Sequence, residues 1–240
     1  IYIYSNLKQN NIMTHYILID GSWYIFYKYH ATRAYFKLKN KSKNIELDDP
    51  TTNKEFLDDF KTSFLETIKN INDTLKINNS IIIVGKDCKR KDIWRMNLYP
   101  KYKSNRTHDP YVSHFFELAY SILYKEAGVH RFLEHPQLEA DDCIALYTKY
   151  ITDKDPNSKI SIMTADADYM QLIKKNVEMI KPKRGDPYTF ISNNIDNTDP
   201  EKELFCKILS GDKSDFIPNI FKGCGPKTAE KCYKDKDFFN

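Results

Sequence analysis

The segment His15-Tyr-Ile-Leu-Ile-Asp20 is an apolar run that ends in an acid and is followed by a glycine. A short apolar run that stops at residues favouring the start of a helix is typical of a buried strand. Residues 80–84 repeat this composition and lead to Asp87, and residues 159–163 lead to Asp166. We therefore predict three central strands, each followed closely by a carboxylate.

Segments with helical spacing of apolar residues separate the predicted strands. Between Phe56 and Ile71, phenylalanine and isoleucine recur at helical intervals, which places one face of a helix against the sheet. Further helices are expected over residues 112–127, 139–150 and 169–173, further strands over 129–133, 177–180 and 188–191, and a loop over 36–53. This alternation predicts an α/β fold with a mostly parallel sheet flanked by helices, in which ligands gather beyond the carboxyl ends of the strands.

The composition allows one substantial core, because the 240 residues are 41% hydrophobic and 29% charged. The formal net charge of +4 is only mildly basic, but residues 86–106 are rich in lysine and arginine and hold two aspartates. That stretch predicts a surface facing a polyanion, with a solvated charged loop as the alternative. Five cysteines without a CxxC pair predict reduced thiols, and no apolar run is long enough to cross a membrane. We therefore expect a soluble, intracellular protein.

Acidic side chains in five short groups are the candidate metal ligands, and most of them follow predicted strands. They are Asp20, Asp87, Glu139, Asp141, Asp142, Asp166, Asp168, Asp212 and Asp215. Taken singly, such acids are more often helix caps or turn residues, so the prediction depends on their joint placement. At one edge of a sheet, each close pair would repel by about 4 kcal/mol at an effective dielectric near 20, unless cations are bound. Oxygen donors without histidine or cysteine favour two or more Mg²⁺ ions, with Mn²⁺ as a substitute, and two such ions suit phosphodiester hydrolysis.

Two further motifs predict phosphate contacts. Lys103 and Arg106 are three residues apart, so on a helix both would reach the same phosphate, with a solvated basic helix as the alternative. The neighbouring Tyr102 would stack on unpaired bases. Around Gly223 and Gly225, the chain is expected to form a hairpin whose backbone N–H groups grip a duplex without reading its sequence.

Six motifs resemble, in order, those of the flap endonucleases, in particular the bacteriophage 5′ nucleases and the 5′-3′ exonuclease domain of bacterial DNA polymerase I. The motifs are Ile19-Asp-Gly-Ser22, Tyr102-Lys-Ser-Asn-Arg106, Glu139-Ala-Asp-Asp142, Thr164-Ala-Asp-Ala-Asp168, Gly211-Asp-Lys-Ser-Asp215 and Gly223-Cys-Gly-Pro-Lys-Thr-Ala229. The resemblance implies a PIN-like core that cleaves DNA at 5′ flaps, nicks, single-strand/duplex junctions or RNA-primed ends. It also makes all nine acids metal-site residues and identifies Lys103 and Arg106 as the catalytic pair on the arch.

The resemblance further divides the chain into regions. It implies a nuclease core over residues 13–200, with the arch at 95–127, and a helix-hairpin-helix region over 201–240 that we expect to be truncated. In that region Gly223, Gly225, Lys227 and Thr228 would hold duplex DNA, often with a K⁺ ion. Residues 1–12 are expected to be a leader or an extension, or to begin with an edge strand.

Three expectations about partners complete this interpretation. The partner is DNA, including an RNA–DNA hybrid, and not a membrane. The protein is expected to act as a monomer. Two alternatives remain open: a PIN-type ribonuclease, and a non-catalytic module that binds DNA junctions.

Overall fold

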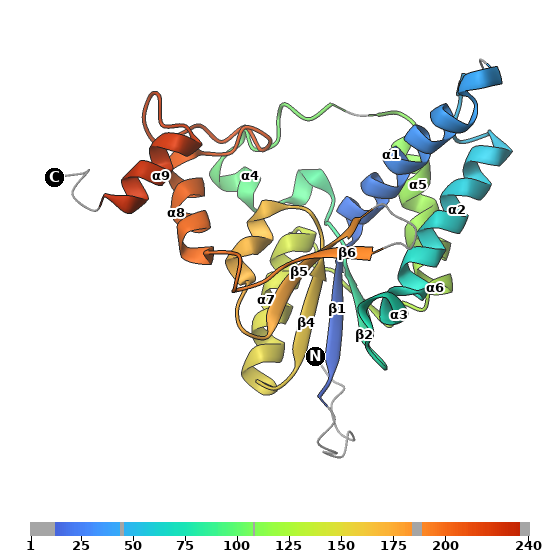
Figure 1. Ribbon diagram of the computed structural model, residues 1–240. Coiled ribbons are helices and arrows are strands. Elements are labelled where there is room, and N and C mark those ends of the chain that lie inside the picture. Colours follow the sequence, from blue (N-terminus) through green and yellow to red (C-terminus); the bar gives the residue numbers. More distant parts are fainter. Residues whose placement is uncertain (1–12, 44–45, 108, 184–188, 236–240) are drawn as a thin grey trace.

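The computed structural model describes residues 13–43, 46–107, 109–183 and 189–235. Within these residues, six strands form one sheet in the order β3-β2-β1-β4-β5-β6. The strands are β1 (His15–Asp20), β2 (Ile81–Gly85), β3 (Arg131–Leu133), β4 (Lys159–Met163), β5 (Val177–Lys183) and β6 (Thr189–Asn193). All neighbours are parallel except β5 and β6. The mostly parallel sheet expected from the sequence is confirmed (Figure 1).

The register of β1 places the ends of the central strands side by side. Asp20 pairs with Gly85 at the end of β2, and Ile19 pairs with Met163 at the end of β4. The residues after these three strands therefore start from the same edge of the sheet, at the top of Figure 1.

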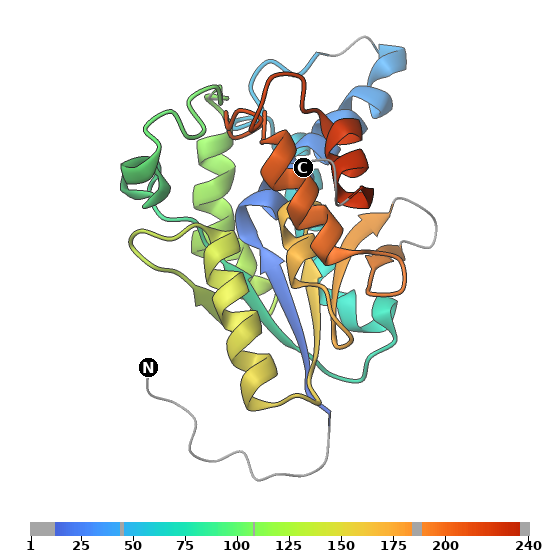
Figure 2. The ribbon, with the colours of Figure 1, turned by 90° about the vertical axis from the view of Figure 1, so that its left-hand side faces the viewer.

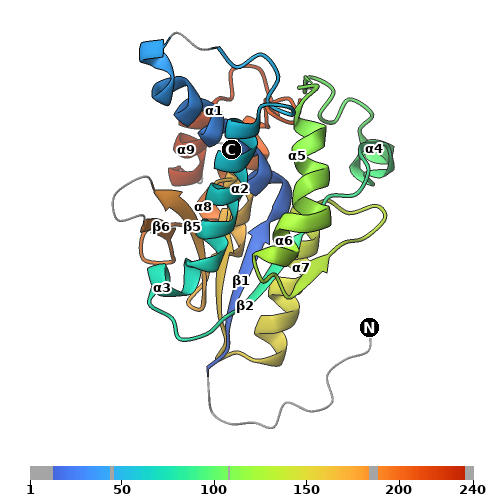
Figure 3. The ribbon, with the colours of Figure 1, turned by 90° about the vertical axis from the view of Figure 1, so that its right-hand side faces the viewer.

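Helices cover both faces of the sheet, and β1 is therefore buried on both sides. Ile17 and Ile19 enter one hydrophobic core, whereas Leu18 enters the other. The first core lies under α1 (Gly21–Lys39), α2 (Lys54–Lys69), α3 (Ile71–Leu75), α5 (Val112–Leu118), a π-helical turn (Ala119–Leu123) and α6 (Tyr124–Glu126). The second lies under α7 (Ala140–Lys154) and the 3-10 helix η4 (Ala167–Leu172). Figure 3 shows the first set of helices, and Figure 2 shows α7 on the opposite side.

A helix pair stands beside the carboxyl edge of the sheet. It consists of α8 (Pro200–Ser210) and α9 (Pro226–Lys234), which pack around a small core of Leu209, Cys224, Ala229 and Cys232. The short helices η2 (Arg90–Asp92) and α4 (Arg95–Leu98) follow β2, and residues 99–107 then run along the top of the molecule (Figure 1).

Some expectations about local structure were wrong. The loop predicted over residues 36–53 begins later, because α1 continues to Lys39 and a 3-10 turn follows at Lys41–Lys43. The helix expected over 169–173 is the 3-10 helix η4. The predictions for residues 1–12, for Tyr188 and for the last residues of the 201–240 region concern positions outside the described residues. None of the helices in the described ranges has the length and apolar character needed to span a bilayer.

Candidate functional site

Asp20 is the deepest of the acidic side chains. It ends β1 and caps α1, where its Oδ1 accepts a hydrogen bond from the Trp23 N–H at 3.0 Å. The side chain is nearly buried, and this burial, aided by the charges of Asp87 and Asp166, raises the pKa of Asp20 to about 7. Asp87 and Asp166, which follow β2 and β4, are thus close enough to influence Asp20 at the end of β1.

Asp87 and Asp166 are held by backbone groups. The Oδ1 atom of Asp87 accepts from the Ala140 N–H at 2.7 Å, which ties the loop after β2 to the start of α7. Asp166 caps η4 by accepting from the Asp168 N–H at 3.0 Å. Neither Asp87 nor Asp166 forms an ion pair with any described residue, so both carboxylates keep oxygens for a ligand.

Glu139, at the start of α7, accepts hydrogen bonds from three side chains. Its carboxylate accepts from the Tyr102 hydroxyl at 2.9 Å, from Lys103 Nζ at 2.5 Å and from Arg95 Nη1 at 3.2 Å. Its own N–H donates to Asp142, which completes a capping box. These bonds offset the cost of burying the carboxylate of a residue that is only 4% exposed.

Arg95 pairs with the acids of the same turn. Its two terminal nitrogens donate to the two Asp142 oxygens at 2.7 and 2.8 Å, a bidentate arrangement. Burial opposes ionisation of Asp142, but the bonds and charge of Arg95 hold the pKa of that carboxyl below its usual range. Burial also raises the pKa of Asp141 to about 6, because the more distant Arg95 does not compensate it fully.

Lys207 of α8 forms ion pairs with two further acids, Asp168 and Asp212. Its ammonium pairs with Asp168 and, at 2.8 Å, with Asp212. Despite partial burial, the bonds from Lys207 and Ser214 lower the pKa of Asp212 to about 2. Burial still raises the pKa of Asp168, even though Lys207 acts in the opposite direction.

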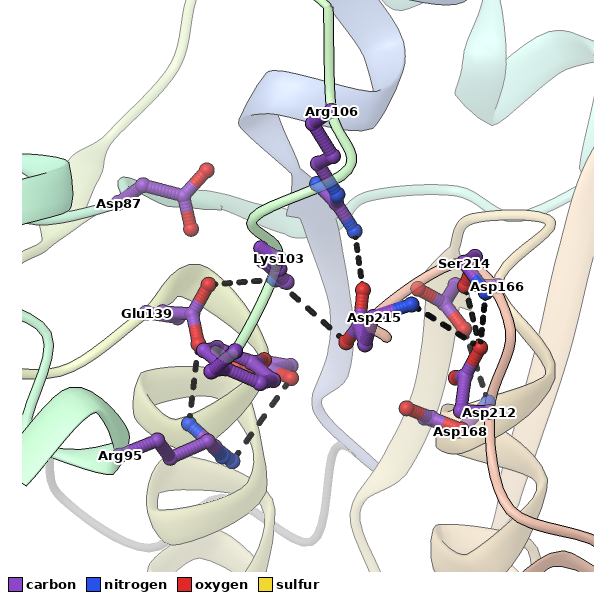
Figure 4. Close-up of polar contacts among 12 residues, drawn as sticks. Asp87, Arg95, Lys103, Arg106, Glu139, Asp166, Asp168, Asp212, Ser214 and Asp215 are labelled. Carbon is purple, nitrogen blue, oxygen red and sulfur yellow. Dashed lines mark hydrogen bonds and ion pairs between the residues drawn. The ribbon is translucent and has the colours of Figure 1, made fainter. Parts of the chain in front are cut away.

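Lys103 and Arg106 contact Asp215 in the loop after α8, and Lys103 also contacts Glu139 at the start of α7. Arg106 Nη2 lies 2.6 Å from Asp215 Oδ1, and Lys103 Nζ lies 3.8 Å from Asp215 Oδ2. Figure 4 shows Lys103 between Glu139 and Asp215. The helix considered for this pair is wrong, because the chain turns there and Lys103 has a φ of 56°. The two side chains nevertheless meet at one carboxylate.

The structure places the expected DNA-binding residues in two settings. Tyr102 is 4% exposed and bonds to Glu139, which is a supporting position rather than the exposed one that base stacking requires. Gly223 and Lys227 are exposed, in the loop before α9 and in its first turn. Gly223 has a φ of 85°, and its carbonyl accepts from Gly225 N–H at 2.9 Å and from Thr228 Oγ1 at 3.4 Å.

Sequence reasoning missed Arg95 and Lys207 as site residues. Arg95 was counted only as part of the basic stretch, and Lys207 lies on a helix with no motif of its own. One signal for Lys207 was its position about one helical turn before the Gly211-Asp212 pair. For Arg95 no local signal exists, because its partners lie on α7.

The donor chemistry of the site fits hard divalent cations. The acids supply only carboxylate oxygens, which suit Mg²⁺ or Mn²⁺. In the described parts of the chain, however, no three acidic, histidine or cysteine side chains stand in positions that would together hold a metal ion. Most of the acids are instead neutralised by Arg95, Lys103, Arg106 and Lys207. Metal ions would bind here in exchange for these internal cations.

Comparison with known proteins identifies relatives. Residues 15–205 match a family described as 5′-3′ exonuclease, N-terminal resolvase-like domain. The chain is 26% identical to a DNA polymerase I of Rhizobium leguminosarum over 240 residues, which are 97% of this chain and 21% of that protein. It is 29% identical to a 5′-3′ exonuclease of Aquifex aeolicus over 214 residues, 88% of this chain and 66% of that protein. The chain thus spans about a fifth of the first relative and two thirds of the second.

Two solved structures of bacteriophage T5 proteins share the fold. One, co-crystallised with metal ions, is 18% identical and has a TM-score of 0.60. The match covers 92% of this chain and 74% of the chain of that structure. The other is a flap endonuclease in a pseudo-enzyme–product complex with DNA and metal ions; it is 17% identical, with a TM-score of 0.62 and the same coverage. At these identities the likeness shows the fold alone, which confirms the PIN-like architecture.

Proposed function

Since the chain belongs to the 5′-3′ exonuclease family, we propose that it is a Mg²⁺-dependent, structure-specific 5′ nuclease. Its substrates would be DNA with 5′ flaps, nicks, single-strand/duplex junctions or RNA-primed ends, hydrolysed during replication or repair inside the cell. The protein would act as a monomer.

One observation carries this proposal. Lys103 and Arg106 reach the same carboxylate, Asp215, and Lys103 also donates to Glu139 at the start of α7. A phosphate needs cationic donors on one side and metal ligands on the other, and few surfaces offer both. A substrate phosphate would compete with the Asp215 carboxylate for these two cations.

The acids divide into two candidate sets of metal ligands. Asp20, Asp87, Glu139, Asp141 and Asp142 would hold one ion, and Asp166, Asp168, Asp212 and Asp215 the other. When bound, divalent ions supply an activated water molecule and neutralise charge on the attacking and leaving oxygens. Mn²⁺ should replace Mg²⁺, because it accepts the same oxygen donors.

Lys103 and Arg106 would then orient the scissile phosphate. Lys103 supplies a compact charge and Arg106 a planar fork for two phosphate oxygens. Both are now paired with carboxylates, so substrate binding would exchange these partners for phosphate oxygens. Their contribution should appear mainly in the rate of cleavage, since charge accumulates on the phosphate as the bond breaks.

The α8–α9 pair would hold the duplex part of the substrate. Gly223 and Gly225 expose backbone next to Lys227 and Thr228, and the first turn of α9 adds the positive end of a helix dipole. Contacts of this kind are made to the DNA backbone and do not depend on sequence. A K⁺ ion shared between the loop carbonyls and a phosphate is part of this proposal.

Cleavage of two substrates, compared side by side, tests the proposal. The protein should cut a 5′-flap DNA in Mg²⁺ and leave a single-stranded RNA of equal length largely intact. A preference for the RNA would favour a PIN-type ribonuclease instead. Binding of the flap without cleavage in either Mg²⁺ or Mn²⁺ would point to a non-catalytic module that recognises DNA junctions.

A further inference from the structure

Arg90 has no part in the proposed function, yet its side chain is bonded to the backbone of Lys103. Arg90 opens η2, in the segment that follows Asp87. Its Nη2 atom donates to the Lys103 carbonyl oxygen at 2.6 Å, across 13 positions of the sequence. A hydrogen bond from a charged donor is stronger than one between neutral groups. The guanidinium forms no ion pair with any described residue, so this backbone oxygen is its main partner there.

The backbone of Lys103 needs outside support. Its φ of 56° lies in the left-handed region, which is unfavourable for a residue with a Cβ atom. The Lys103 N–H donates to the Asp215 carbonyl at 2.9 Å, and the Lys103 carbonyl accepts from the Arg106 N–H at 3.2 Å and from Arg90. Both lone pairs of this carbonyl are therefore used. The turn is held by the loop after α8 on one side and by η2 on the other.

The conformation of this turn sets the position of the Lys103 ammonium. The Nζ atom lies 2.5 Å from Glu139 Oε1 and 3.8 Å from Asp215 Oδ2. If φ of Lys103 relaxed to a negative value, the Cβ atom would point in another direction and the ammonium would move with it. A displacement of about 1 Å in a group that acts on the reacting atoms can lower a rate about 100-fold.

We propose that Arg90 is a positioning residue for the cleavage reaction. Its guanidinium, bonded to the Lys103 carbonyl, holds the left-handed turn that presents the Lys103 ammonium to the scissile phosphate. This inference rests on the proposed function, because it requires Lys103 to act in cleavage. It also connects the segment that carries Asp87 with the segment that carries the basic pair.

A double-mutant cycle tests whether Arg90 acts through Lys103. Arg90→Met removes the donors and keeps an unbranched apolar side chain, and single-turnover cleavage of a 5′-flap DNA in Mg²⁺ at saturating protein gives the rate. Arg90→Met should cleave about 10- to 100-fold more slowly than the unaltered protein. In the Lys103→Met background the same change should have little further effect, because the group that Arg90 positions is already absent. An equal loss in both backgrounds would overturn the positioning role.

Hydrogen exchange tests the same contact without any reaction. The Lys103 amide is bonded to the Asp215 carbonyl, so its exchange, followed by NMR in protein free of metal and DNA, reports how firmly the turn is held. In Arg90→Met this amide should exchange about 10-fold faster or more, while the Leu18 amide in the centre of β1 keeps its protection. Equal exchange of the Lys103 amide in the two proteins would overturn the proposal, whatever the cleavage rates.

Arg131→Met is the matched control. Arg131 is an exposed arginine on β3, so this variant loses the same charge at a site away from the turn. It should cleave the flap at the rate of the unaltered protein and leave the Lys103 amide exchange unchanged. Its affinity for the flap DNA should equal that of Arg90→Met. A clearly weaker affinity in Arg90→Met would identify Arg90 as a direct DNA contact and overturn the positioning role.

The outcomes separate this inference from the proposed function. If the unaltered protein cleaves the flap and Arg90→Met cleaves it equally fast, the positioning role is overturned and the proposed function stands. If the unaltered protein does not cleave the flap, the proposed function fails and the positioning role in cleavage fails with it. The exchange of the Lys103 amide then still shows whether Arg90 holds the turn.

Discussion

Lys103 is joined to Asp215 twice. Its backbone N–H donates to the Asp215 carbonyl at 2.9 Å, and its ammonium lies 3.8 Å from the Asp215 carboxylate. The backbone bond holds Lys103 in a left-handed conformation that a lysine rarely adopts. The loop after α8 thus shapes the turn that presents the basic pair, and the two parts of the site depend on each other.

The first prediction concerns Lys103. Lys103→Ala should lower the rate of 5′-flap cleavage about 100-fold or more, because a donor to the charge that develops on the phosphate is lost. Lys101→Ala is the matched control. Lys101 is exposed and two residues from Lys103, so this variant should cleave the flap at the rate of the unaltered protein. Single-turnover cleavage assays would measure both, with circular dichroism to verify folding. Full activity in Lys103→Ala would refute the role given to this side chain.

The second prediction concerns the pH dependence of stability without metal. The pKa of Asp20 is raised to about 7 in the folded protein, so the fold favours the protonated acid. The contribution of Asp20 to stability is therefore complete below the pKa of the unfolded chain, near 3.8, and is lost as the pH rises through about 7. Urea unfolding in EDTA should show this decline, and Asp20→Asn should flatten it.

The effect of His15 on stability must be distinguished from that of Asp20 in the same experiment. Burial lowers the pKa of His15, so its contribution to stability is present above about 6.5 and is lost as the pH falls. His15 and Asp20 thus act in opposite directions. The difference between the unaltered protein and Asp20→Asn isolates the aspartate, and an identical pH profile for the two proteins would contradict the assignment.

The third prediction concerns Arg95 and Asp142. Their bidentate pair is partly exposed, so a double-mutant cycle with Arg95→Met and Asp142→Asn should give a coupling free energy of about 1 to 2 kcal/mol in EDTA. In Mg²⁺ the coupling should shrink, because the cation competes with Arg95 for the acids of α7. Equal coupling with and without Mg²⁺ would argue against metal binding at this turn.

The fourth prediction concerns Gly211, which ends α8 with a φ of 68°. A Cβ atom at this position would lie 2.4 Å from the Pro218 carbonyl oxygen. Gly211→Ala should therefore distort the loop that carries Asp212 and Asp215 and weaken duplex binding, as measured by fluorescence anisotropy. Gly128→Ala is the control: its φ is also positive, but the Cβ meets open space, so it should cost about 1 to 2 kcal/mol of stability and keep DNA affinity.

The sheet was predictable because its signal is local. The apolar runs that form β1, β2 and β4 are short and buried on both faces, as parallel strands between helix layers are. Since acids follow each of these runs, their meeting at one edge followed from topology. The sequence therefore sufficed to predict that Asp20, Asp87 and Asp166 lie at or just after strand ends on one edge of the sheet.

Local structure around the acids was harder to predict. After β4, the Asp166 side chain accepts from the Asp168 N–H, and this side-chain bond favours a tight turn over an α-helix. At Lys103, the conformation depends on a hydrogen bond to Asp215, which is distant in the sequence. No periodicity of the sequence carries information about a contact of that kind.

The pairing of acids with internal cations was not predictable either. Arg95 and Asp142 are 47 positions apart in the sequence, and Lys207 and Asp168 are 39 positions apart, so only the tertiary fold brings each pair together. Tyr102 illustrates the same limit: its position beside basic residues suggested contact with bases, but its ring is buried and its hydroxyl supports Glu139.

Product mapping on a 5′-labelled double-flap DNA, with and without Mg²⁺, would decide whether this protein is a metal-dependent 5′ nuclease. We expect release of a short labelled fragment from the 5′ flap in Mg²⁺ only, with a 5′ phosphate on the remaining strand, and loss of this product in Asp168→Ala. An uncut flap at excess protein in both Mg²⁺ and Mn²⁺, or equal cleavage in EDTA, would refute the proposed metal-dependent nuclease activity.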